Sequence, residues 1–242
     1  MKRILLFIVA GWSLLHAQFA PVPQQAILGE VHGDHAVVAL SGAAPGSSGI
    51  VLHKFDDRHS AIIATAIVTG SKEGKTSLRF QRYRRLRQKA LPQYKIAPQQ
   101  GDIVILGYLY NRVLPIVPDE AAYKRFLLGH RALDVIHPDL FASALYFDHT
   151  PQPAKRDFYK ACVQNDLGLL YFAVDREGYF VDCESFRIVA REPLPEAIDA
   201  KRSMQPFYSR IPRIKNRLGG ILSDESIGDY NRYYKKVLGI QK

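Results

Sequence analysis

Short apolar segments alternate with polar turns through the first half of the chain, and this spacing is typical of β-strands. The apolar segments are residues 26–31, 36–40, 50–55, 61–69, 76–86, 102–110 and 113–117. Between the first two, Gly33-Asp34 has the composition of a two-residue hairpin turn. Many short strands at close spacing predict a compact β-barrel or sandwich.

After residue 118 the apolar positions take up helical spacing. Residues 119–128, 138–147 and 155–163 predict three helices, the second of which starts at His137-Pro138-Asp139. Residues 167–174, 179–182 and 186–189 then predict a small meander of strands. A last helix is expected from Ser223, as its N-cap, to Leu238, with Gly239 ending it. The fold class is therefore α+β.

The N-terminus has the pattern of a signal peptide. Lys2 and Arg3 precede an apolar run of about twelve residues, and Ala17 offers a cleavage site before Gln18. Such a run is too short to cross a hydrocarbon core of ~30 Å as a helix. We therefore expect an exported protein without a transmembrane segment, in the periplasm or on the outer cell surface.

These patterns predict four parts. Residues 1–17 form the signal peptide, 18–118 a β-rich domain, 119–200 a smaller α+β part, and 201–242 a basic C-terminal segment with a terminal helix.

Charge and cysteine usage add two expectations. The formal net charge of +10 favours anionic partners of the cell envelope. Cys162 and Cys183 are the two cysteines, and an oxidising compartment would allow them to form a disulfide. Two separate buried thiols explain them equally well, because a free cysteine behaves as a small apolar residue.

None of the candidate catalytic motifs has the spacing or structural context that its chemistry requires. Residues 70–76 (GSKEGKT) have three residues between the glycines where a phosphate-binding loop needs four, and a strand follows. His32, Asp34 and His35 fall on the predicted hairpin turn, which is a poor metal site. Ser47 and Ser48 lack the strand-to-helix elbow of a nucleophile. We expect no enzyme activity, metal or cofactor; an envelope hydrolase would need a pocket with converging acids.

Residues 72–89 are strongly basic, with eight cations and one acid. Phe80 and Tyr83 lie within a run of arginines, namely Arg79, Arg82, Arg84, Arg85 and Arg87. This composition would suit nucleic acid, but export argues against that partner. Either the segment is a solvated strand edge protected by its charge, or it binds an anionic envelope ligand.

Several sequence blocks together resemble the N-terminal domain of the plasminogen-binding protein family of Helicobacter, Campylobacter and their relatives. The blocks are GIVLHKF (49–55), AIIA (61–64), QKALP (88–92), Gly101-Asp102, GYLYNR (107–112), HPDLFA (137–142), Asp157-Phe158 with Cys162, GLLYF (168–172) and VDCESF (181–186). The resemblance covers about residues 20–190. It implies an exported, surface-associated protein that binds host plasminogen through lysines, in some members through a Lys-rich C-terminal extension.

Two functions follow from this resemblance. In the first, the protein binds plasminogen through Lys242. The side-chain ammonium of this terminal lysine is close to its free carboxylate, and such a pair suits a pocket with opposed charges, as in a plasminogen kringle. Lys235 and Lys236 are further candidate contacts. This chain carries only these lysines in place of a long Lys-rich tail. In the second, it is a periplasmic structural component whose segment 72–89 docks on an envelope assembly such as the flagellar motor or the cell wall.

Overall fold

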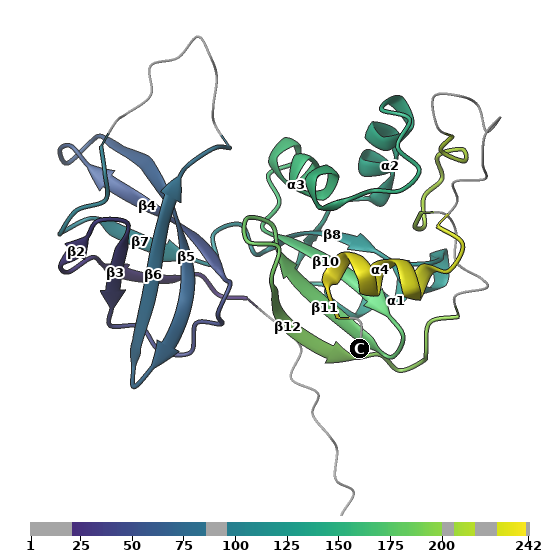
Figure 1. The fold of residues 1–242 in the computed structure, drawn as a ribbon, viewed down its shortest axis with the longest axis horizontal. Coiled ribbons are helices and arrows are strands. Elements are labelled where there is room, and N and C mark those ends of the chain that lie inside the picture. Colours follow the sequence, from purple (N-terminus) through teal and green to yellow (C-terminus); the bar gives the residue numbers. More distant parts are fainter. Residues whose placement is uncertain (1–20, 86–95, 200–205, 216–226, 241–242) are drawn as a thin grey trace, which may run out of the picture.

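A computed structural model describes residues 21–85, 96–199, 206–215 and 227–240. In these ranges two β-sheets lie side by side, and four helices surround the second one (Figure 1). The fold is therefore α+β and rich in strands, which confirms the predicted class. The expected signal peptide lies outside the described residues.

The first sheet has seven strands, all paired antiparallel, in the order β1-β7-β4-β5-β6-β3-β2. It curls as a half-barrel around a core that includes Val51, Leu78 and Val104. Its strands are β1 (Gln24–Ile27), β2 (Val31–His32), β3 (His35–Val38), β4 (Ser48–Lys54), β5 (Ser60–Lys72), β6 (Lys75–Arg82) and β7 (Ile103–Leu106).

The second sheet has five strands in the order β12-β11-β10-β8-β9. β8 runs parallel to its neighbours β10 and β9, and the remaining pairs are antiparallel. Its strands are β8 (Arg112–Ile116), β9 (Asp134–Val135), β10 (Leu169–Val174), β11 (Glu177–Asp182) and β12 (Ile188–Pro193). The helices are α1 (Glu120–Gly129), α2 (Pro138–Phe147), α3 (Lys155–Gln164) and α4 (Tyr230–Leu238).

Helices cover both faces of the second sheet. Successive side chains of a strand point to opposite faces, and every residue of β10 is buried. Tyr171 packs on Phe126 of α1, with ring centroids 4.3 Å apart. The next residue, Phe172, packs on Phe158 of α3 and Tyr234 of α4. Thus α1 lies on one face, and α3 and α4 lie on the other.

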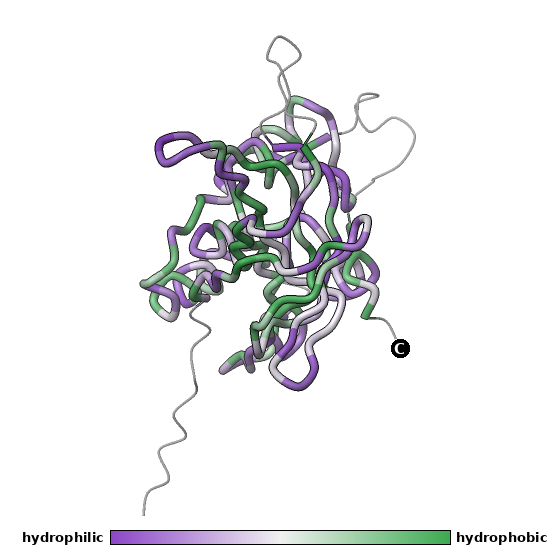
Figure 2. Tube along the Cα trace, turned by 90° about the vertical axis from the view of Figure 1, so that its left-hand side faces the viewer, coloured by the Kyte–Doolittle hydropathy of each residue, from purple (hydrophilic) through white to green (hydrophobic). Residues whose placement is uncertain are grey.

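Local interactions define several turns and helix starts. Gly33, with φ of +62°, forms the turn between β2 and β3. Asp119 caps α1 by accepting the Ala122 N–H at 2.8 Å. His137 caps α2 by accepting the Asp139 N–H at 3.1 Å. In Figure 2, polar colour marks many of the loops and turns, while the strands between them are more apolar.

Several predicted elements differ from the structure. The strand expected at 26–31 is divided between β1 and β2, which lie at opposite edges of the first sheet. The strand expected at 113–117 within the β-rich domain is β8 of the second sheet. Its apolar residues are buried on both faces, as suits a central parallel strand. The last helix begins at Tyr230 rather than after Ser223, because Gly228 has φ of +66° and Asp229 is the cap. Gly239 ends this helix in the left-handed conformation, as predicted.

Within the described part of the chain, no helix combines the length and the apolar character that crossing a bilayer requires.

Candidate functional site

A buried carboxylate joins the two sheets. Asp182, the last residue of β11, is fully buried and accepts five hydrogen bonds. Its Oδ2 accepts from the Ser48 N–H at 3.2 Å, the Ser48 hydroxyl at 2.5 Å and the Tyr110 hydroxyl at 3.0 Å. Its Oδ1 accepts from the N–H groups of Glu184 at 3.0 Å and Ser185 at 2.6 Å. One side chain therefore connects β4 with the end of β11.

Burial dominates the electrostatics of this junction. Loss of water contact raises the pKa of Asp182, against the opposing effect of the bonds from Ser48, Ser185 and Tyr110. Burial and the charge of Asp182 also raise the pKa of Tyr110. The hydroxyl of Ser48 donates to a carboxylate, which is a structural arrangement rather than that of an activated nucleophile.

The turn after β11 strengthens the same junction. The Ser185 hydroxyl donates to the Gly46 carbonyl at 2.6 Å. Cys183 forms a disulfide with Cys162 of α3, with the two Cα atoms 6.0 Å apart. The turn is thus tied both to the first sheet and to a helix of the second half.

Arg85 belongs to this junction, although the sequence places it in the basic segment 72–89. Its side chain is 5% exposed, and its Nε lies 2.7 Å from Glu184 Oε1. Phe80, an aromatic residue of the same segment, points into the core of the first sheet. The strand alternation that exposes Arg79 buries Phe80, because neighbouring side chains face opposite ways.

The exposed cations of this region form the basic hairpin, which we define as Lys72, Lys75, Arg79 and Arg82 of β5 and β6. Lys72 pairs with Glu73 at 3.3 Å, and both side chains are highly exposed. Arg84, just beyond β6, is also exposed. Arg87 lies outside the described residues.

Helix α4 carries two of the predicted lysines and is anchored to the rest of the protein by two buried tyrosines. Tyr230 and Tyr234 are fully buried, and their hydroxyls donate to the carbonyls of Ile116 and Pro206, both at 2.8 Å. Lys235 Nζ lies 2.5 Å from Asp175 Oδ2, and Lys236 is exposed. The third predicted lysine, Lys242, lies outside the described residues.

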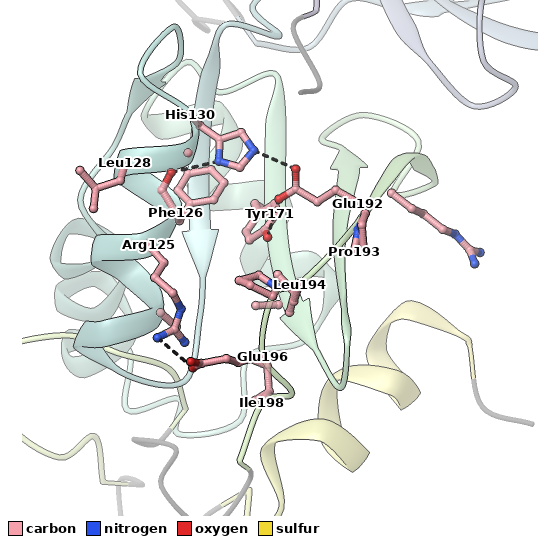
Figure 3. A pocket seen from close by; sticks show the side chains of 15 residues that line it. Arg125, Phe126, Leu128, His130, Tyr171, Glu192, Pro193, Leu194, Glu196 and Ile198 are labelled. Carbon is pink, nitrogen blue, oxygen red and sulfur yellow. Dashed lines mark hydrogen bonds and ion pairs between the residues drawn. The ribbon is translucent and has the colours of Figure 1, made fainter. Parts of the chain in front are cut away.

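A pocket of about 700 Å³ lies between α1, the strands β10 and β12, and residues 194–198 (Figure 3). Its walls are mainly apolar and include Phe126, Leu128, Ala173, Leu194 and Ile198. This pocket could not be predicted from the sequence, because its walls come from segments about 70 residues apart. Taken separately, these segments indicate only a helix and the end of a strand.

A hydrogen-bonded cluster lines one end of the pocket. Glu192 accepts from the Tyr171 hydroxyl at 2.8 Å and faces His130 Nε2 at 3.0 Å. The other ring nitrogen of His130 faces the Phe126 carbonyl at 3.0 Å. A carbonyl oxygen only accepts, so Nδ1 is the donor in the bond to Phe126. Burial and the negative charge of Glu192 raise the pKa of Tyr171.

Comparison with known proteins identifies the family. A family model described as "Plasminogen-binding protein pgbA N-terminal" matches residues 26–238. The chain belongs to this family. The match spans both sheets and α4, so the family unit includes the junction at Asp182 as well as the pocket. It confirms the resemblance that the sequence blocks indicate.

Two curated relatives are the plasminogen-binding protein PgbA of two Helicobacter pylori strains. Each is 25% identical over 199 residues, which cover 81% of this chain and 43% of the relative. The chain therefore spans less than half the length of these relatives.

Among the residues that the structure describes, no group of three or more His, Cys, Asp or Glu side chains could hold a metal ion.

Proposed function

We propose that the protein is an exported, non-enzymatic binding protein that recognises a protein partner through lysines near its C-terminus, with host plasminogen as the candidate ligand. The observation that carries this proposal is the family match over residues 26–238, joined to the printed name of the Helicobacter pylori relatives. The position of Lys236 on a well-anchored helix supports it.

The chemistry of the lysines suits this kind of partner. A lysine is a compact charge on a flexible stem, so it can enter a pocket whose acidic groups bind ammonium. Lys236 is exposed, and Lys235 is held by a partly exposed Asp175, which a partner's carboxylate could replace. Lys242 follows Gly239 by three residues and is the third proposed contact.

Removing these lysines should weaken plasminogen binding at least tenfold. The test compares the unaltered chain with a Lys235→Ala/Lys236→Ala variant that also ends at Gln241, by surface plasmon resonance on immobilised plasminogen. A charged hydrogen bond contributes about 1.5–3 kcal/mol, so losing one already accounts for a tenfold change. Lys124→Ala and Lys160→Ala, on α1 and α3, are the matched controls and should change affinity less than twofold. Equal binding by all variants would contradict the lysine mechanism.

A second candidate function rests on the basic hairpin. Four exposed cations on one β-hairpin, with Glu73 as the acid at its tip, favour an anionic envelope ligand. In this proposal the protein is a periplasmic structural component that docks on an envelope assembly.

The hairpin proposal predicts salt-sensitive binding to anionic vesicles. Each Lys or Arg near such a surface contributes about 1 kcal/mol, so Lys75→Ala/Arg79→Ala should weaken binding by roughly tenfold to thirtyfold at low salt. Lys124→Ala/Arg131→Ala removes the same charge from another part of the surface and should have a smaller effect. Equal losses from the two variants would show that net charge alone drives binding.

Cell fractionation with crosslinking separates the two functions. Exposure of the protein on the cell surface favours the first function, and retention with a periplasmic complex favours the second.

A further inference from the structure

The pocket beside α1 has a closed end and an open end of different chemistry. At the closed end His130 and Tyr171 are 6% and 2% exposed, and their polar atoms bond to Glu192. At the open end Arg125 and Glu196 are 42% and 72% exposed. Figure 3 shows the two polar groups separated along the pocket, with apolar side chains between them.

The two ends differ in what they can still bind. Both carboxylate oxygens of Glu192 already have partners, Tyr171 on Oε1 and His130 on Oε2. Each oxygen of Glu192 is thus already engaged by a donor of the protein itself, which makes this carboxylate less available to a cationic ligand. The guanidinium of Arg125 has five N–H donors, but its ion pair with Glu196 spans 3.5 Å. Such an exposed pair contributes about 0–1 kcal/mol, so a ligand can displace Glu196 into water at little cost.

The second arginine of the pocket lining is engaged elsewhere. Arg191 lies over the ring of Tyr179, 5.3 Å from its centroid, and its Nη1 lies 3.8 Å from Glu177 Oε2. Because Tyr179 and Glu177 do not line the pocket, Arg125 is the better placed of the two cations, and a planar guanidinium matches a carboxylate in bidentate geometry.

We propose that this pocket binds a small amphipathic carboxylate, with its carboxylate on Arg125 and its apolar chain against Phe126, Ala173, Leu194 and Ile198. The volume of about 700 Å³ lies within the range of small-molecule sites, about 300–1,000 Å³. The site is separate from the lysines of α4, because α1 and α4 cover opposite faces of the second sheet.

Linear saturated carboxylates provide the direct probe. Isothermal titration calorimetry with hexanoate, octanoate and decanoate should show affinity rising about fourfold per added methylene, since each buried methylene contributes about 0.8 kcal/mol. Decyltrimethylammonium, which has an alkyl chain of similar length and the opposite charge, should bind at least tenfold more weakly than decanoate. Absence of decanoate binding at millimolar concentration, or tighter binding of the cation, would overturn the proposal.

Variants separate the two parts of the site. Arg125→Ala should weaken decanoate binding at least tenfold and leave binding of decanol, which has no charge, within twofold. Ile198→Trp, which fills part of the pocket, should weaken both. Arg131→Ala removes the same charge from an exposed position that does not line the pocket and should change neither. Circular dichroism confirms that each variant is folded. Loss of decanol binding in Arg125→Ala, or equal decanoate affinities of Arg125→Ala and Arg131→Ala, would overturn the assignment of the carboxylate to Arg125.

Discussion

Replacing Asp182 by alanine is expected to lower the free energy of unfolding by about 3–5 kcal/mol, because several buried donors lose their acceptor. The substitution removes the acceptor of five hydrogen bonds at a fully buried position. The donors of Ser48 and Tyr110 would then lie at the junction of the two sheets without their partner. An unsatisfied buried polar group costs about 1–3 kcal/mol, and local relaxation keeps the total below the sum of these penalties.

Urea unfolding followed by circular dichroism measures this loss. Asp182→Asn keeps the volume but places an amide NH₂ against donors, so its loss should fall between that of Asp182→Ala and zero. Asp57→Ala, at an exposed turn of the first sheet, is the matched control and should change stability by less than about 0.5 kcal/mol. A loss below 1 kcal/mol in Asp182→Ala would show that the junction does not depend on this carboxylate.

Removing the disulfide is expected to lower the free energy of unfolding by about 3 kcal/mol. Cys162 and Cys183 are 21 residues apart, and a crosslink that closes a loop of this size restricts the unfolded chain by about that amount. The Cys162→Ala/Cys183→Ala variant should unfold at a lower urea concentration than the oxidised protein.

Reductant provides the control for this second prediction. Dithiothreitol should destabilise the unaltered protein to nearly the same extent as the double substitution, and it should leave the variant unchanged. If reductant and substitution both shift the free energy of unfolding by less than 1 kcal/mol, the disulfide does not stabilise the fold.

Local patterns of the sequence predict much of the fold. The turn at Gly33, the start of α2 at His137 and the end of α4 at Gly239 depend on neighbouring residues only, so composition and spacing predict them. Helix and strand periodicity similarly indicates which residues are buried. The sheet to which β8 belongs does not follow from such patterns, because an apolar strand can pair in either sheet.

The junction could not be predicted because its partners are far apart in sequence. Ser48 and Asp182 are separated by 134 residues, and Arg85 and Glu184 by 99. Arg85 therefore reads as one more cation of a basic segment, although it is buried against an acid. The block 181–186 contributes to the family resemblance, yet nothing in a single sequence says which residues it contacts.

Competition by a lysine analogue on the unaltered protein shows whether lysines mediate binding to plasminogen. The protein is passed over immobilised plasminogen with increasing 6-aminohexanoate, which carries the ammonium and carboxylate of a lysine ligand. We expect measurable binding that falls to background as the analogue saturates plasminogen, while an equal concentration of hexanoate, which lacks the ammonium, leaves binding intact. Binding that persists at saturating analogue, or no binding without it, would contradict a lysine-mediated plasminogen-binding function.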